Sequence, residues 1–353
     1  LIRLPDRPAW HRLALLAAGY LISPIMPSGN SRLALVLPMF RDMAKGGGLQ
    51  PGGRAITGLI TATFAGSMLF SPMMATSKSS NIAALALLPR QVQSEFGGLF
   101  WLVAAGVAAV GLTVLHLCAD RLFFREDHSA PLPRKELEAQ LAGLGSLGAD
   151  EWAATACTLF FLGGAATVPW HHVQPSWLAG FVLMALLVTG VFKKQEFRQQ
   201  VDWCMIFFLL GLDSVTRMME YVGLDTELAR AAGDLFGFVH GSFPVFILAS
   251  LVTTLVVRMA LPLTAGMVLS TIILLPVAAA EGIHPWLCVF LTALFSDIWF
   301  FRYQSSVYLQ MVSSGEVERV DESTFLRHNN VMNLARVVVA FLSIPWWRWL
   351  GLL

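Results

Sequence analysis

The residues with the clearest chemical potential in this chain lie where apolar runs are interrupted. The stretch PSGNSR at 27–32 separates two apolar arms, KSSN at 78–81 follows a long apolar run, and RYQSS at 302–306 follows another. Hydroxyls, amides and the free N–H groups of a helix that begins at such a break bind anions, carboxylates especially. Basic residues at or near the breaks strengthen this interpretation, because charge inside a membrane is expensive and usually functional. The pattern predicts a site for a small anion.

The composition explains why these breaks are informative. The chain has 353 residues, of which 56% are hydrophobic and 13% are charged, whereas about 25% is usual for soluble domains. We therefore expect an all-α, multi-pass protein of the cell (inner) membrane, with the lipid bilayer as its solvent. Hydrocarbon tolerates broken backbone only where it is buried in protein or lines a wet cavity. Several breaks in one chain thus indicate a shared aqueous site near the midplane.

The basic residues in the loops predict how the chain is threaded. Two regions, 13–43 and 242–281, each hold two apolar arms, the shorter ones too short to cross comfortably. Lys and Arg flank both ends of the first region and are absent close to both ends of the second. By the positive-inside rule, the first is a re-entrant hairpin that opens from inside and the second one that opens from outside. Hairpin, broken span and span then recur with opposite orientation, an inverted-topology repeat typical of secondary transporters.

This threading divides the chain into four parts. We expect a first transport repeat over 1–123, a cytoplasmic linker over 124–150, linking spans with an outer amphipathic helix over 151–241, and a second, inverted repeat over 242–353. The elements of the first repeat are an inner hairpin at 13–43, a broken span at 54–89 and a span at 98–119. Those of the second are an outer hairpin at 242–281, a broken span at 284–312 and a span at 329–351.

At these breaks the chain resembles the divalent-anion/sodium symporter family, which carries dicarboxylates, citrate and sulfate. The family's first hairpin turns on Ser-Asn-Thr, and a dicarboxylate-translocating branch reads Pro-Ser-Asn-Thr-Ala-Arg where this chain has PSGNSR, with Pro38 closing the following run. The family's Gly-Thr-Pro-Pro-Asn corresponds to SKSSN at 77–81. The resemblance begins near Leu13 and lacks the N-terminal spans that usually form part of the dimer scaffold. It implies a truncated or divergent carrier of small divalent anions and, by analogy, a homodimer.

The resemblance also implies which residues face the substrate. In the second hairpin, counting back from Pro276 by the interval that separates Ser28 from Pro38 places the tip at Gly266, with Thr264 among the nearest hydroxyls. No Ser, Asn or Thr stands at the counted position, so we expect the first half of the chain to contribute more to substrate recognition than the second. The expected substrate-binding residues are Ser28, Gly29, Asn30, Ser31, Arg32, Lys78, Ser79, Ser80, Asn81, Thr264, Gly266, Gln304, Ser305 and Ser306.

The resemblance names Na⁺ as a coupling ion and no other cofactor. In the family, the hairpin turns and broken spans supply oxygens to sodium beside the substrate, and a fixed cation in the same cage would repel it. Lys78 and Arg302 stand where such repulsion would act, with Ser28 and Asn30 on the hairpin side. We hypothesise that the two basic residues substitute for sodium, which makes the protein an exchanger or a proton-coupled carrier.

Two other classes of protein are the alternatives. A membrane-embedded enzyme is disfavoured because neither His-Glu-x-x-His nor Gly-x-Ser-Gly occurs. A receptor or regulatory subunit that binds an anion without moving it stays open, because the second hairpin departs from the family pattern. The four cysteines, at 118, 157, 204 and 288, lack metal-ligand spacing, and no basic stripe suggests nucleic acid.

Overall fold

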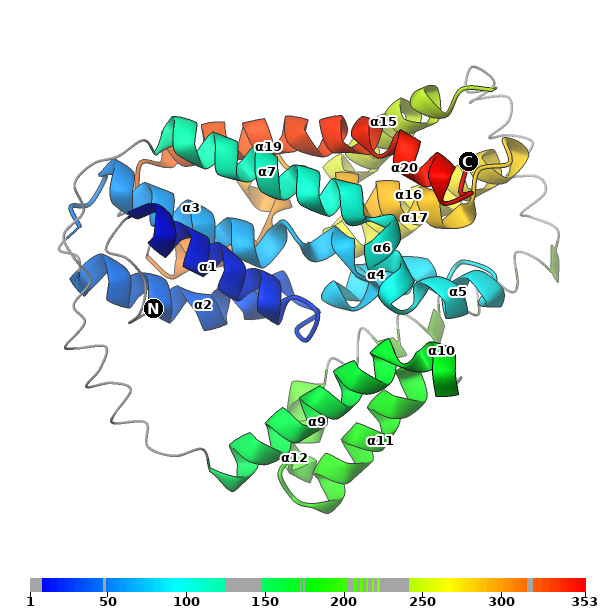
Figure 1. Cartoon of the computed structure of the whole chain (residues 1–353), viewed down its shortest axis with the longest axis horizontal. Helices are drawn as coiled ribbons and strands as arrows, with labels where there is room; N and C mark the ends of the chain where they lie inside the picture. The colour runs from blue at the N-terminus through cyan, green and yellow to red at the C-terminus, as the bar shows by residue number, and fades with distance from the viewer. Residues whose placement is uncertain are drawn as a thin grey trace.

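The computed structural model describes residues 8–46, 49–124, 148–171, 173, 175–201, isolated positions between 203 and 222, 241–315 and 320–353. Every regular element in these ranges is a helix. The cytoplasmic linker expected at 124–150 lies almost wholly outside the described residues, as do the outer amphipathic helix and most of the last linking span expected within 151–241. Figure 1 shows two groups of helices in one elongated body, with α9, α10 and α11 set apart from it.

The first group contains a helical pair and a broken helix. Helices α1 (Pro8–Ile22) and α2 (Gly29–Gly46) flank a non-helical bend, and α3 (Arg54–Met68) is followed by two single 3₁₀ turns, η1 (Ser71–Met73) and η2 (Ala75–Ser77), before α4 (Ser79–Leu85). Prolines at 24, 27 and 72 favour both interruptions, because each lacks the N–H that a continuous helix needs. Short helices α5 (Arg90–Phe96) and α6 (Leu99–Ala104) lead to α7 (Gly106–Phe123).

A pair of glycines sets the crossing of α1 over α3. A Cβ built on Gly19 would lie 2.3 Å from the carbonyl carbon of Gly66, and one on Gly66 would lie 2.8 Å from the carbonyl oxygen of Leu15. Only glycine allows two helix backbones to approach this closely, as in small-residue contacts between membrane helices. Helix α1 is thereby held close against α3.

The second group repeats this order. It contains α15 (Phe243–Ala260), α16 (Leu263–Ala280), α17 (Pro285–Ser296), the 3₁₀ turn η4 (Arg302–Gln304) and α18 (Ser306–Ser313), followed by α19 (Glu322–Leu342) and α20 (Ile344–Trp349). Figure 1 shows α19 lying beside α7, so the last long helices of the two groups are neighbours.

The tip of the second helical pair is not at Gly266, so the counted position was wrong. The break lies at Leu261 and Pro262, and Gly266 is buried in the first turn of α16. The count failed because Pro38 follows the first residue of α2 by nine positions, whereas Pro276 follows the first residue of α16 by thirteen. Aligned on their helix starts instead, Thr264 matches Asn30, and Gly266 matches Arg32.

Helix lengths fit a membrane protein. Among the described residues, four helices are long and apolar enough to cross a bilayer: Arg54–Met73, Gly106–Phe123, Phe243–Ala260 and Leu263–Ala280. The last two are the arms of the second pair, and 18 residues each span about 27 Å against a hydrocarbon core of about 30 Å. These arms are longer than the sequence predicted, so length alone does not separate a re-entrant hairpin from two crossings.

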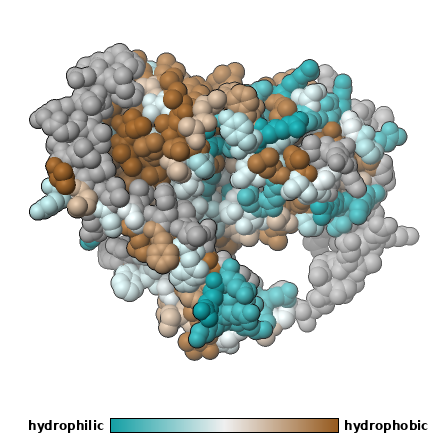
Figure 2. Space-filling view, turned by 180° about the vertical axis from the view of Figure 1, so that it is seen from behind, coloured by the Kyte–Doolittle hydropathy of each residue, from teal (hydrophilic) through white to brown (hydrophobic). Residues whose placement is uncertain are grey.

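Exposed apolar side chains mark the faces that meet lipid or protein. Leu248, Val252, Val256 and Met259 form an exposed stripe along α15 at helical spacing, and Figure 2 shows a broad hydrophobic area on the face seen from behind. Helices α9 (Ala149–Ala166) and α11 (Pro175–Val188) pack on each other, joined through α10 (Val168–His171), and α12 (Lys194–Gln200) follows. The exposed side chains of α9 and α11 are also largely apolar, as helices in contact with lipid require.

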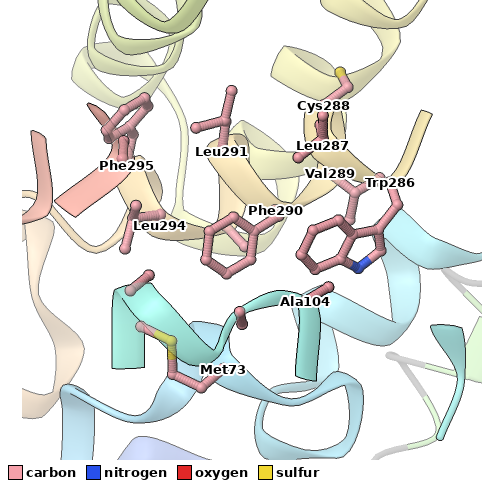
Figure 3. Close-up of a cluster of buried hydrophobic side chains, with 14 of the residues drawn as sticks. Met73, Ala104, Trp286, Leu287, Cys288, Val289, Phe290, Leu291, Leu294 and Phe295 are labelled. Carbon is pink, nitrogen blue, oxygen red and sulfur yellow. The ribbon is translucent and has the colours of Figure 1, made fainter. Parts of the chain in front are cut away.

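The main core joins the two groups through α17, whose side chains from Trp286 to Ser296 are all buried. A helix that is apolar on all sides belongs in the interior. The Trp286 ring stacks between Phe96 and Phe290, at centroid distances of 4.9 and 5.0 Å. Figure 3 shows the side chains of Trp286 and Phe290 pointing toward Met73 and Ala104 of the first group. One consequence is that the two broken helices, α3–α4 and α17–α18, are held side by side.

Asp321, in the loop before α19, provides a test of stability outside the membrane-spanning segments. Its carboxylate accepts from the backbone N–H groups of Ser323 and Thr324 at 3.0 and 3.2 Å and caps the helix. Hydrogen bonding from the Thr324 side chain, and then from the Ser323 side chain, lowers the pKa of Asp321. A lowered pKa means that the ionised cap stabilises the fold above the usual Asp range, and that this stability is lost as the pH falls through the folded-state pKa.

Asp321→Ala is therefore expected to lower the free energy of unfolding by about 1 kcal/mol at neutral pH. The difference from wild type should disappear in acid. Thermal melting of the detergent-solubilised protein at neutral and acidic pH measures it. Asp321→Asn is the matched control, because asparagine also caps but does not titrate in this range. A loss of stability in Asp321→Ala that is the same at neutral and acidic pH would contradict this account.

Candidate functional site

The breaks of the two broken helices meet at a buried ion pair. Lys78 precedes α4 in extended backbone, and Asp297 follows the last residue of α17. The Lys78 ammonium is bonded to Oδ1 of Asp297. The two residues are only 7% and 3% exposed. This pair connects positions 219 residues apart, so it ties the first group to the second at the point where both helices are interrupted.

Arg32 lies beside this pair and binds the first break. Its Nε donates to the carbonyl of Ser67 at 2.8 Å, and its Nη1 donates to the carbonyls of Met26 and Ser77 at 2.7 and 2.6 Å. Its Nη2 donates to Ser71 Oγ at 2.5 Å. The side chain is fully buried. Arg32 therefore satisfies three carbonyls that the interruptions leave without helical partners.

Arg258 does the same at the second break. Its Nε and Nη1 donate to the carbonyls of Ser296 and Leu261, both at 3.2 Å, and its Nη2 donates to the carbonyl of Gln304 at 2.7 Å. Although Arg258 also interacts with the charge of Asp297, its hydrogen bonds among the described residues go to backbone carbonyls. Gly266 makes room for this side chain, because a Cβ there would lie 3.0 Å from Cδ of Arg258.

The electrostatic character of the site is positive. Arg32, Lys78, Arg258 and Arg336 all interact with the charge of Asp297, and all five residues are buried. Four cations around one carboxylate leave an excess of three positive charges among the described residues here. Isolated buried charge is strongly unfavourable. An anion that enters this region would offset part of that cost.

The tip of the first pair contacts both broken helices. The backbone N–H of Ser79 donates to the carbonyl of Pro27 at 3.1 Å, and Ser306 Oγ donates to Asn30 Oδ1 at 3.3 Å. Gly29 packs so tightly that an added Cβ would lie 2.7 Å from Met68 Sδ and 3.0 Å from Val307 Cγ2. Glycine at this position thus lets the start of α2 sit between the two broken helices.

The remaining predicted residues of the first half are placed around this contact. Ser28 accepts from the backbone N–H of Ser31 at 3.3 Å, and the Ser31 side chain is exposed. Asn81 Nδ2 donates to the carbonyls of Ser71 and Met74 at 2.8 and 2.9 Å, which folds the loop before α4. Ser80 Oγ and Asn81 Oδ1 are buried and have no partner among the described residues, and the same holds for Ser77 Oγ. These atoms can therefore bond to a ligand or water.

The predicted residues of the second half have mostly structural contacts. Gln304 Oε1 accepts from the backbone N–H groups of Phe300 and Phe301 at 2.9 and 3.1 Å, and Ser305 caps α18 by accepting from Tyr308 N at 3.2 Å. Thr264 is half-buried in the first turn of α16. Arg302 does not join the buried cluster: its side chain is 63% exposed and it pairs with Glu322 at 2.7 Å.

Arg336 was missed by the sequence reasoning. It is buried on α19 and lines a cavity of about 20 Å³ with Thr61, Phe64, His328 and Asn329, among others. A signal was available, because an arginine within an apolar stretch is rarely placed without a function. Arg336 lies outside the polar breaks at 27–32, 78–81 and 302–306, so their pattern did not predict it.

A comparison with protein families matches nearly the whole chain. Residues 7–353 match the family described as the sodium:sulfate symporter transmembrane region. No curated protein matches the chain. The match covers nearly every residue that contributes to the helical pairs, the broken helices and the cationic cluster. The chain therefore belongs to the sodium:sulfate symporter family and is a multi-pass helical membrane protein of a sodium-coupled anion transporter family.

Proposed function

We propose that this protein moves small divalent anions, di- or tricarboxylates or sulfate, across the cell membrane by alternating access. The observation that carries the proposal is the excess of buried positive charge where the two broken helices meet. Buried charge of this size needs a counter-ion. A substrate with two negative charges supplies one and reduces the excess from three positive charges to one.

The chemistry around the cluster suits recognition of oxygens on a small anion. The hydroxyls of Ser77 and Ser80 are buried without a partner among the described residues, so each has a proton to donate. The first turn of α2 adds N–H groups and the positive end of an 18-residue helix. Lys78 contributes a full charge that the substrate shares with Asp297.

The inverted repeat is part of the proposal. Its support is the order of elements, because a helical pair, a broken helix and a long helix occur twice in the described chain. Alternating access follows if the pairs and broken helices move together relative to the other spans. The homodimer expected from the family resemblance stays a prediction.

We further propose that Lys78 takes the place of a coupling sodium ion. Its ammonium occupies the first break, where family members offer oxygens to sodium, and it is already bonded to Asp297. A second cation in the same cage would be repelled. The substitution is proposed for Lys78 alone, because Arg302 is exposed and paired elsewhere.

Uptake by purified protein in liposomes tests both statements. Labelled succinate, citrate and sulfate are offered with and without an inward sodium gradient. We expect uptake of at least one of the three anions, with a rate that changes less than about twofold with sodium because the fixed ammonium supplies the charge. A strong sodium dependence would reject the role of Lys78 and leave the anion carrier intact.

The second candidate is an anion receptor that does not transport. It is favoured by the many structural bonds at the second break, which leave fewer groups there for substrate. Counterflow separates the two candidates. Binding of a labelled anion to the purified protein, without exchange across the liposome membrane, would support the receptor.

A further inference from the structure

We propose that Arg32 and Arg258 are a matched pair of positioning residues. Each fastens the tip of its own helical pair to both sides of the break in its own broken helix. A tip and its broken helix then form one mechanical unit, and neither tip opens separately. The inference rests on the proposed function only for its consequence in transport, because the bonds themselves do not depend on a substrate.

Three of the four bonds of Arg32 have a counterpart in the three bonds of Arg258. Each Nε donates to the carbonyl of a serine in the last turn before the break, Ser67 in one group and Ser296 in the other. Each Nη1 donates to a carbonyl at the tip, Met26 or Leu261.

The third bond completes the correspondence. Each guanidinium also binds a carbonyl two residues before the helix resumes, Ser77 before α4 and Gln304 before α18. Three equivalent carbonyls in each group are thus bound by a single side chain.

The two arginines reach this arrangement from different helices. Arg32 is the fourth residue of α2, the second arm of its pair. Arg258 is in the last turn of α15, the first arm of its pair, and the fourth residue of α16 is Gly266. The Gly266 backbone lies against the Arg258 side chain. In the first group, the side chain of Arg32, at the fourth position of its helix, fills this space. In the second group, Gly266 holds the fourth position, and the side chain of Arg258 fills the equivalent space.

An arginine is required here for a chemical reason. Each unpaired carbonyl in a membrane interior costs several kcal/mol, and each break presents three of them to one side chain. The guanidinium carries five donors in a flat fork, whereas lysine is a point charge with three donors at one atom. Lysine would keep the charge and still leave carbonyls unbound, so charge and positioning can be separated by mutation.

Cysteine labelling tests the assignment. The reporters are Ser77→Cys and Ser296→Cys, each in a background in which the four native cysteines are replaced by alanine. Both serine side chains are fully buried, and each carbonyl accepts from one arginine. Each reporter is combined with Arg32→Lys and with Arg258→Lys, and the rate of maleimide labelling is measured on folded protein in detergent without substrate.

The expected result is a crossed pattern. Arg32→Lys should speed labelling at position 77 by about tenfold or more and leave position 296 unchanged, because local opening is governed by local bonds. Arg258→Lys should do the reverse. Arg12→Lys is the matched control, since Arg12 is equally buried but pairs with Asp120 at 2.8 Å; it should change neither rate.

Two outcomes would overturn the proposal: labelling that rises at both positions with either variant, which indicates general loosening, or labelling that rises at neither. If a lysine variant does not fold, amide exchange on the unmodified protein decides. Residues 24–28 and 71–78 should then exchange as one unit, and a tip that exchanges much faster than the loop contradicts the assignment. Neither readout involves transport, so failure of the proposed function would leave both results interpretable.

Discussion

Lys78→Met is expected to abolish anion uptake and to destabilise the protein. The substitution removes one of the buried cations and leaves the Asp297 carboxylate without the ammonium that binds it. Removal of one partner from a buried ion pair costs about 3–5 kcal/mol, because the carboxylate stays in the interior without a cation bonded to it. Uptake into liposomes and the melting temperature of the purified protein measure the two effects.

The double variant Lys78→Met/Asp297→Asn separates folding from transport. It has no unpaired carboxylate at this position, so its melting temperature should recover most of the loss while uptake stays absent. Arg302→Gln is the control for removal of a basic residue, and its exposed ion pair should contribute no more than about 1 kcal/mol. Full uptake by the double variant would show that Lys78 has only a structural role.

Asn30→Ala is expected to abolish uptake, whereas Thr264→Ala should weaken it. The two residues hold the same place, second in the helix that follows each tip. Asn30 makes a contact between the two groups: its Oδ1 accepts from Ser306 Oγ, which joins the first tip to the second broken helix. The variant loses that contact between the groups, as well as an amide that can donate to the substrate. Thr264 offers a single hydroxyl.

Initial rates over a range of anion concentrations distinguish the two variants. For Asn30→Ala no saturable uptake is expected. For Thr264→Ala we expect a KM raised several-fold at nearly unchanged kcat. This pattern is expected when the lost contact bound the substrate equally well in the ground state and in the transition state. Ser31→Ala, at the exposed neighbour of Asn30, tests whether the loss is specific to Asn30. Equal losses in the Asn30 and Thr264 variants would mean that the two tips contribute alike.

The breaks were predictable because polar groups at membrane depth are costly. Pro27, Lys78 and Arg302 stood out against apolar neighbours, and the structure interrupts its helices next to each of them. For the second pair, the sequence predicted the region that contains the tip but not the residue at which the chain turns. Its counted position failed because a proline inside a helix does not report how far it lies from the helix start.

The sequence by itself determined that this is a helical membrane protein whose apolar runs are interrupted by polar breaks, because hydrophobicity, turn residues and charge are local properties. It also carried the family resemblance that the family match supports. Only the tertiary structure decided that Lys78 meets Asp297, that Arg302 is turned away to Glu322, and that Arg32 and Arg258 bind backbone. Those pairings join residues distant in the chain, and which partner a buried charge finds depends on how the helices pack.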